Sequence, residues 1–219
     1  MDSKVVNREI KRIVWPALKG ADFETFTSRV AWRHGNEKID VVALQSFNKY
    51  NADVMGVTTF SFAVRLGSLP LYIPPRWPPK TKNGLQLPSE SECYFRGSLQ
   101  CSLQSRTKDK TIWSVDAEGK NLSWCIQDVL NQIPDALAWF SRLSQKYEVL
   151  RILRDDDERM PALWGFGRNP SPVRSYLAGY AALSVGDQVL AETRLREAVE
   201  SKCFVNLFNS VEGAINRAA

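Results

Sequence analysis

Few residues of this sequence have types and spacings that would support chemistry. His34 is the one histidine, and it lies in the polar turn Arg33-His34-Gly35-Asn36 without placed partners. A catalytic triad needs a nucleophile, a base and an orienting acid, so this histidine alone does not support that reaction. The sequence also lacks a Gly-x-Ser-x-Gly elbow, a phosphate-binding loop and a dinucleotide fingerprint. These absences argue against the usual hydrolases and nucleotide enzymes, and they favour a non-enzymatic protein.

Metal and thiol chemistry have little support. The acidic run Asp155-Asp156-Asp157-Glu158 has the ligand type that a hard cation prefers. Consecutive carboxylates point in different directions, however, so we interpret this run as a solvated helix end. The cysteines, at positions 93, 101, 125 and 203, form no Cys-x-x-Cys pair, and we expect buried thiols. The sequence therefore predicts no metal site and no cofactor.

Ten polar, basic or aromatic residues remain as candidates for contacting a partner: Gln45, Lys49, Tyr50, Arg65, Tyr72, Arg76, Trp77, Lys80, Lys82 and Arg96. Gln45 ends an apolar strand run, and its amide either ties the strand to the next loop or contacts a ligand. Arg65 and Arg96 lie on strand faces opposite Val64 and Phe95. We expect them on the wet side of a sheet, where an acidic neighbour or an acidic partner can pair with them.

A subset of these residues combines positive charge with rings, as single-stranded nucleic-acid sites do. The subset is Lys49 and Tyr50 in one loop, with Arg76, Trp77, Lys80 and Lys82 in another. The net charge of +5 is concentrated in residues 1–120, which hold 18 Lys and Arg against 12 Asp and Glu. A basic excess attracts phosphate backbones or an acidic protein. Nucleic acid is therefore the alternative partner.

The strands are predicted from alternation of side chains. Residues 38–66 hold two such runs around a polar loop, with Ile39, Val41 and Ala43 in the first and Phe60 to Leu66 in the second. A period of two places alternate residues on opposite faces of a sheet. Further strands are expected within 23–33, 93–103 and 111–116. Successive strands of this kind indicate an antiparallel sheet of about five strands with one apolar face that needs a cover.

The cover is predicted to be helical. Residues 4–18 have apolar positions at helical spacing, and Pro16 and Gly20 should kink or end that helix. After about residue 121 the pattern is helical, with two helices flanking Gly186-Asp187 and a last one over 204–216. The fold class is therefore α+β, with a sheet domain at 1–156 and a helical C-terminal extension at 157–219 packed on it. We expect a soft boundary near 156–172.

The segment Gly67 to Glu90 contains six prolines, which exclude a central strand. A loop of this length tends to be functional or disordered. Its aromatic residues and polyproline stretches suit docking on a partner, whereas the alternative is a crossover packed on the sheet edge.

Over about residues 4–154 the chain resembles a bacterial family of domains of unknown function, family 4304. The matching motifs are Ile10 to Leu18, Val42-Ala43-Leu44-Gln45-Ser46, Phe60 to Gly67, Glu92-Cys93-Tyr94-Phe95-Arg96, Trp113-Ser114-Val115 and Leu150 to Arg154. Two departures are Gly20-Ala21-Asp22-Phe23, where the family has Gly-Phe, and the length of the proline-rich loop. The resemblance implies a fold and a bacterial origin, and it implies no catalytic residue.

A weaker similarity links Tyr176 to Glu200 with a single tetratricopeptide hairpin. Its small residues Gly179, Ala191 and Ala198 would let two antiparallel helices approach closely. One hairpin does not build the concave groove of a repeat array, so we expect it to pack on the main domain.

Taken together, the sequence favours a non-enzymatic bacterial protein-protein interaction domain of unknown partner. One specific version is an immunity- or antitoxin-like protein, although proteins that mask basic nucleases are more often acidic. The alternative is a nucleic-acid-binding protein that uses the basic N-terminal half. No apolar run approaches the roughly 20 residues that a membrane span needs, so we expect a cytoplasmic protein with no membrane partner.

Overall fold

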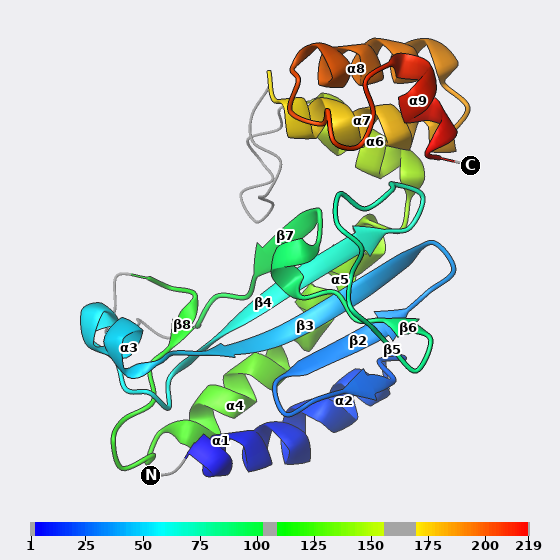
Figure 1. Cartoon of the computed structure of the whole chain (residues 1–219). Helices are drawn as coiled ribbons and strands as arrows, with labels where there is room; N and C mark the ends of the chain where they lie inside the picture. The colour runs from blue at the N-terminus through cyan, green and yellow to red at the C-terminus, as the bar shows by residue number, and fades with distance from the viewer. Residues whose placement is uncertain (1–2, 103–108, 156–169, 219) are drawn as a thin grey trace.

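The computed structural model of the chain describes residues 3–102, 109–155 and 170–218 (Figure 1). Its centre is one antiparallel sheet in the order β1 (Thr25–Phe26), β2 (Val30–His34), β3 (Lys38–Ser46), β4 (Phe62–Pro70) and β7 (Phe95–Ser98). A further strand, β8 (Ile112–Trp113), pairs with the beginning of β4. The predicted antiparallel sheet and α+β class are confirmed.

The alternation in β3 and β4 sets the register of the sheet. Val42 lies opposite Leu66, and Leu44 lies opposite Val64, so the larger apolar side chains of both strands share one face. A shift of one residue would turn that whole set to the other face, which is why the register is well specified.

Helices from both ends of the sheet region cover this apolar face. The first helix runs as α1 (Ser3–Glu9), a π-helical turn η1 (Ile10–Val14) and α2 (Trp15–Lys19), and it continues through Pro16 to end at Gly20. Proline has no N–H to donate to the turn before it, and the wider π turn lies directly before that position. Then α4 (Leu122–Asn131) and α5 (Ile133–Arg142) complete the cover. The buried side chains at this contact include Ile10, Val14, Val42, Leu44, Phe62, Val64, Ile126, Val129 and Phe140.

The second face is covered where the sequence predicts a wet one. The segment after β4 lies across it, so that Trp32, Val41 and Leu69 are buried with Ile73. Two hydrogen bonds fix the segment, from Trp32 Nε1 to the carbonyl of Pro88 (2.7 Å) and between His34 Nε2 and the carbonyl of Gln86 (2.8 Å). Apolar side chains on both faces of β2 to β4 account for this second cover.

The segment also has structure of its own. It contains a hairpin of β5 (Thr81–Lys82) and β6 (Leu85–Gln86) and a 3-10 turn, η2 (Glu90–Glu92). Asn83 and Gly84 both have positive φ angles, of 52° and 80°, as a two-residue hairpin turn requires. Of the two predicted alternatives, the packed crossover describes this segment better, although it lies over a face of the sheet and not only at its edge. The prediction that Gly67 to Glu90 contains no central strand was wrong for its first four residues, because β4 continues to Pro70 between β3 and β7.

The C-terminal helices are α6 (Lys146–Arg154), α7 (Pro172–Ser184), α8 (Gln188–Glu200) and α9 (Val211–Asn216), which lie together at one end of the sheet (Figure 1). Tyr176 is at the centre of an aromatic cluster with Tyr180, Phe204 and Phe208. Tyr176 Oη donates to the carbonyl of Pro74 (2.6 Å), and Arg217 Nη2 donates to that of Pro75 (3.0 Å). The proline-rich segment therefore joins these helices to the sheet.

Other expectations need revision or lie outside the described residues. The polar loop between β3 and β4 contains a short helix, α3 (Lys49–Met55), which the sequence analysis missed. The last helix begins at Val211 and not near position 204, where the chain forms turns. Leu103, the soft boundary at 156–169 and most of the acidic run at 155–158 lie outside the described residues.

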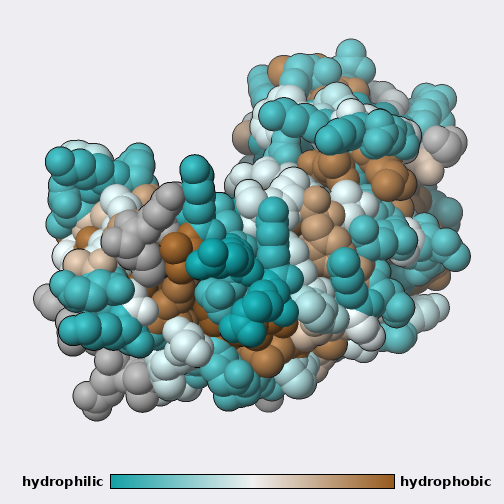
Figure 2. Space-filling model, turned by 90° about the horizontal axis from the view of Figure 1, so that it is seen from below, coloured by the Kyte–Doolittle hydropathy of each residue, from teal (hydrophilic) through white to brown (hydrophobic). Residues whose placement is uncertain are grey.

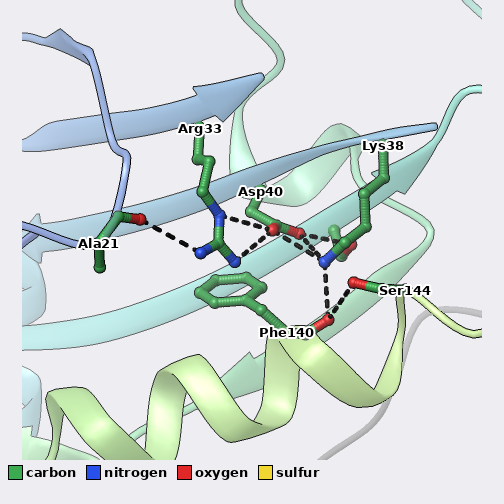
Figure 3. A network of polar contacts seen from close by, with 7 residues as sticks. Ala21, Arg33, Lys38, Asp40, Phe140 and Ser144 are labelled. Carbon is green, nitrogen blue, oxygen red and sulfur yellow. Dashed lines mark hydrogen bonds and ion pairs between the residues drawn. The ribbon is translucent and has the colours of Figure 1, made fainter. Parts of the chain in front are cut away.

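A buried charge network joins the sheet to α5 (Figure 3). Asp40 is 2% exposed, and its carboxylate accepts from Arg33 Nη2 (2.8 Å), Lys38 Nζ (2.8 Å) and Ser68 Oγ (2.9 Å). Lys38 Nζ also donates to the carbonyl of Phe140 (2.7 Å). Burial lowers the pKa of Lys38, and the attraction of Asp40 opposes that shift. Strands β2, β3 and β4 and helix α5 thus share one polar network, whose charges lie on β2 and β3.

We predict that Asp40→Asn destabilises the fold by about 3 kcal/mol, because Arg33 and Lys38 lose their carboxylate while they stay partly buried. Urea unfolding followed by circular dichroism measures the change. The matched control is Asp53→Asn on the exposed side of α3, which should shift stability by less than about 0.5 kcal/mol. Equal shifts for the two variants would show that the network does not stabilise the fold.

We also predict that Gly179→Ala destabilises the α7–α8 hairpin. A Cβ at Gly179 would lie 2.6 Å from Leu195 Cγ, so the helices must move apart, and overpacking of this kind costs about 1–3 kcal/mol. At Gly20 the same substitution meets its nearest atom at an ordinary 3.5 Å and serves as the control. Thermal unfolding of both variants tests this, and an unchanged midpoint for Gly179→Ala would contradict it.

Candidate functional site

The ten predicted binding residues fall in separate parts of the molecule. Lys49 and Tyr50 lie exposed on α3, at one end of the sheet, whereas Lys80 and Lys82 lie exposed at the β5–β6 hairpin near the other end (Figure 1). The structure therefore does not bring the two predicted basic loops together. Arg76, Trp77 and Arg96, in contrast, line one cavity.

This cavity, which we name the Arg76–Trp77 pocket, has a volume of about 230 Å³. It lies where the proline-rich segment, the beginning of β7 and α7 meet. Its lining includes Arg76, Trp77, Glu92, Tyr94, Arg96 and Val173. Because its walls come from three parts of the chain, its shape depends on how the C-terminal helices sit on the sheet.

Two tyrosine hydroxyls fix the inner wall. Tyr94 Oη and Tyr176 Oη both donate to the carbonyl of Pro74, each at 2.6 Å, and Tyr94 Oη accepts from the backbone N–H of Arg76 (3.1 Å). Burial raises the pKa of Tyr94 and of Tyr176. Both phenols therefore keep their protons and act as fixed donors at neutral pH.

At the outer wall a cation lies on an aromatic ring. The Arg76 guanidinium is 4.6 Å from the ring centre of Trp77 and 5.6 Å from that of Phe204. Trp77 is 66% exposed. Within the described part of the chain no carboxylate forms an ion pair with Arg76, so its charge stays available to an acidic group.

The other titratable groups of the pocket are held in place or kept neutral. Glu92 Oε2 accepts from the N–H (2.7 Å) and the hydroxyl (2.9 Å) of Ser89, which forms a capping box for η2. Burial raises the pKa of the Cys93 thiol well above its usual value, and the charge of Glu90 adds to that shift. A thiol that keeps its proton is a poor nucleophile. The pocket is thus better suited to binding than to covalent chemistry.

Gln45 and Arg65 contact each other on the open part of the second sheet face. Arg65 donates to Gln45 Oε1 (3.2 Å), to Ser98 Oγ (2.6 Å) and to Thr111 Oγ1 (3.3 Å). These bonds link β3, β4 and β7 and the approach to β8. Gln45 therefore ties strands together, and both side chains are already engaged.

Tyr72 lies away from the pocket. Burial raises the pKa of its hydroxyl, and Lys146 Nζ lies 5.3 Å from its ring centre. Lys146 in turn pairs with Glu37 at 2.6 Å. These contacts attach the beginning of the proline-rich segment to α6.

Glu92, Tyr94 and Val173 line the pocket but were not predicted as site residues. The spacing Ser89-x-x-Glu92 is a capping-box signal that was available in the sequence. Val173 carries no such signal, because the fold brings it to the pocket from a distant part of the chain.

Two classes of site find no support in the described part of the chain. No cluster of three or more histidine, cysteine or acidic residues is arranged there to hold a metal ion. None of the helices described has the length and apolar character of a membrane span. No cysteine pair forms a disulfide, and Cys203 is exposed, so the expectation of buried thiols was wrong for that residue.

Comparison with known protein families, curated proteins and solved structures finds no match for this chain. The resemblance to family 4304 therefore stays a prediction, and we infer the function from the geometry of the site.

We predict that Tyr94→Phe loosens the pocket wall. The variant removes one donor to Pro74 and the acceptor for the Arg76 N–H, and a lost buried hydrogen bond costs about 1–2 kcal/mol. Urea unfolding measures stability, and hydrogen exchange measures protection of residues 74–79. Tyr147→Phe, at a 74% exposed tyrosine, is the control. Unchanged protection in Tyr94→Phe would mean that this hydroxyl does not order the segment.

Proposed function

We propose that this chain is a non-enzymatic protein-interaction domain that docks its partner at the Arg76–Trp77 pocket. The observation that carries the proposal is the exposed Trp77 ring, held by Arg76 at the mouth of a cavity. Tryptophan and arginine supply most of the binding energy at many protein interfaces. A ring already held in one orientation loses little conformational freedom when a partner covers it.

The chemistry of the pocket favours an acidic partner segment. Arg76 and Arg96 are two basic residues of the lining, while the carboxylate of Glu92 is occupied by Ser89. Leu69, Pro79 and Val173 supply apolar surface to the same cavity. The expected occupant is a segment of another protein that places a carboxylate beside Arg76 and an apolar side chain against Trp77.

Binding is a better proposal than catalysis because the thiol and phenol groups of the pocket are not activated for reaction. Cys93 keeps its thiol proton, and Tyr94 keeps its phenol proton. No histidine is among the residues that line the cavity. A proton-transfer or nucleophilic step would lack a group poised near neutral pH.

A bacterial origin and a cytoplasmic location stay part of this proposal, as does the version in which the domain is immunity- or antitoxin-like. An inhibitor of that kind would cover an acidic surface, since the pocket is basic. Proteins that mask basic nucleases need the opposite charge, so a nuclease is a poor candidate for the partner.

The nucleic-acid alternative is less favoured at the residues predicted for it. Lys49 and Tyr50 lie far from Lys80 and Lys82, so they do not form one track for a strand. Arg76 already stacks on the ring of Trp77. A base would have to compete with that guanidinium for the ring or use its other face.

The test is affinity capture from nuclease-treated native lysate, followed by direct binding of the purified partner. We predict that Trp77→Ala and Arg76→Glu each weaken binding by at least about tenfold, as expected for hot-spot residues. Lys82→Glu makes the same charge change on the same segment, outside the pocket lining, and should bind like the original chain.

Each outcome has a clear meaning once thermal unfolding shows that the variants are folded. Selective loss with the two pocket variants supports docking at the pocket. A partner that binds all variants equally places the interface elsewhere and contradicts the site. Failure to retain any protein contradicts the proposed function itself.

A further inference from the structure

A second concave surface lies on the opposite side of the sheet from the Arg76–Trp77 pocket, along the first helix. It is a groove of about 400 Å³ between the α1–η1 helix and the turn that joins β1 to β2. Its lining residues are Lys4, Asn7, Arg8, Lys11 and Ser28, three of which are basic and none acidic. We name it the α1 groove.

The spacing of the basic residues follows from the helix. Positions 4, 8 and 11 fall on one face at intervals of four and three, while Val6, Ile10 and Val14 are buried against the sheet. Lys4, Arg8 and Lys11 are exposed. Seen from the side on which α1 lies, the surface carries many hydrophilic side chains, with long ones standing out near its middle (Figure 2).

The charges of two of the groove's basic residues, Arg8 and Lys11, are not neutralised by a carboxylate of the described residues. The nearest acidic residue along the helix, Glu9, is engaged by Arg12 at 2.6 Å. Arg8 and Lys11 thus contrast with the buried cations Arg33 and Lys38, which share Asp40.

One buried polar atom of the lining also lacks a partner. Asn7 Oδ1 is buried and has no hydrogen-bond partner among the described residues. Turning the Asn7 amide to offer its NH₂ group would break no bond of that oxygen. The groove can thus add amide and hydroxyl donors to its cations.

We propose that the α1 groove binds a run of phosphate groups. Several cations with neutral donors and no acid are the chemistry that recognises phosphate oxygens. The volume and the spread of three basic residues over two helical turns suit consecutive phosphates better than one small anion. Two sources share this chemistry, a single-stranded nucleic acid and inorganic polyphosphate. The site is separate from the Arg76–Trp77 pocket and does not depend on the function proposed there.

The experiment measures binding of a fluorescent single-stranded RNA and, in a second arm, of inorganic polyphosphate by the 219-residue chain. Neutralising two phosphates, one each at Arg8 and Lys11, predicts a log–log salt slope of about −1.4, so affinity for the strand should fall roughly sevenfold between about 50 and 200 mM salt. The variant pair Arg8→Gln and Lys11→Gln, combined in one chain, should bring the slope close to zero and weaken low-salt binding at least about tenfold.

The matched control is Lys49→Gln combined with Lys82→Gln, which removes the same charge from two exposed sites outside the groove. It should bind like the original chain. Loss only in the groove variant supports the site, and the arm in which binding occurs identifies the source. Absent binding of both probes overturns the proposal, as does equal weakening by the control, which would indicate net charge alone. Because neither variant touches the Arg76–Trp77 pocket, this result is independent of the partner-capture result.

Discussion

The rest of the architecture depends on the ion pairs that the buried carboxylate of Asp40 forms with Arg33 and Lys38. An ionised group that is 2% exposed is tolerable only if its charge is compensated, and Arg33 and Lys38 do so from two adjacent strands. Lys38 Nζ also donates a hydrogen bond to the carbonyl of Phe140. The geometry of β2 and β3 therefore determines where α5 ends, and with it the point from which the chain departs toward α6 and the C-terminal helices. A hydrophobic contact alone would permit α5 to slide, whereas the directed bond from Lys38 to Phe140 opposes sliding.

Much of the fold could be predicted because its signals are local. The alternation in residues 39–44 and 60–66 is enough to predict most of β3, the first part of β4 and their faces, and apolar stripes are enough to predict α4 and α5. The last four residues of β4 were missed, because they lie in the segment whose prolines argue against a strand. Other local signals were present and missed: Asn48 and Gly56 bound α3, and Asn83-Gly84 is the turn of the β5–β6 hairpin. For the hairpin, the proline content of the surrounding segment hid the turn, since prolines argue against a central strand and say nothing about a short surface hairpin.

The candidate site was only partly predictable, because proximity across the fold has no local signal. Arg76, Trp77 and Arg96 were identified from residue type, yet nothing in the sequence shows that they share one cavity. Lys49 and Tyr50 were equally good candidates by residue type, but they lie elsewhere in the structure. The expectation of a wet sheet face was incomplete for the same reason: Trp32 and Val41 need a cover, and the sequence alone does not show that the proline-rich segment provides it.

The carbonyl of Pro74 accepts from Tyr94 on the sheet side and from Tyr176 on the helical side. A carbonyl oxygen has two lone pairs, so both acceptor sites of this one atom are used. The position of the proline-rich segment is consequently fixed at a single residue, Pro74, although the segment has no regular structure there. In a strand, a ladder of backbone hydrogen bonds fixes the position in the same way. The number of residues between Pro70, at the end of β4, and Pro74 therefore sets the distance between the sheet and the C-terminal helices. Evolutionary insertions in this segment should accumulate at the exposed Asn83-Gly84 turn, where they leave the chain length between Pro70 and Pro74 unchanged.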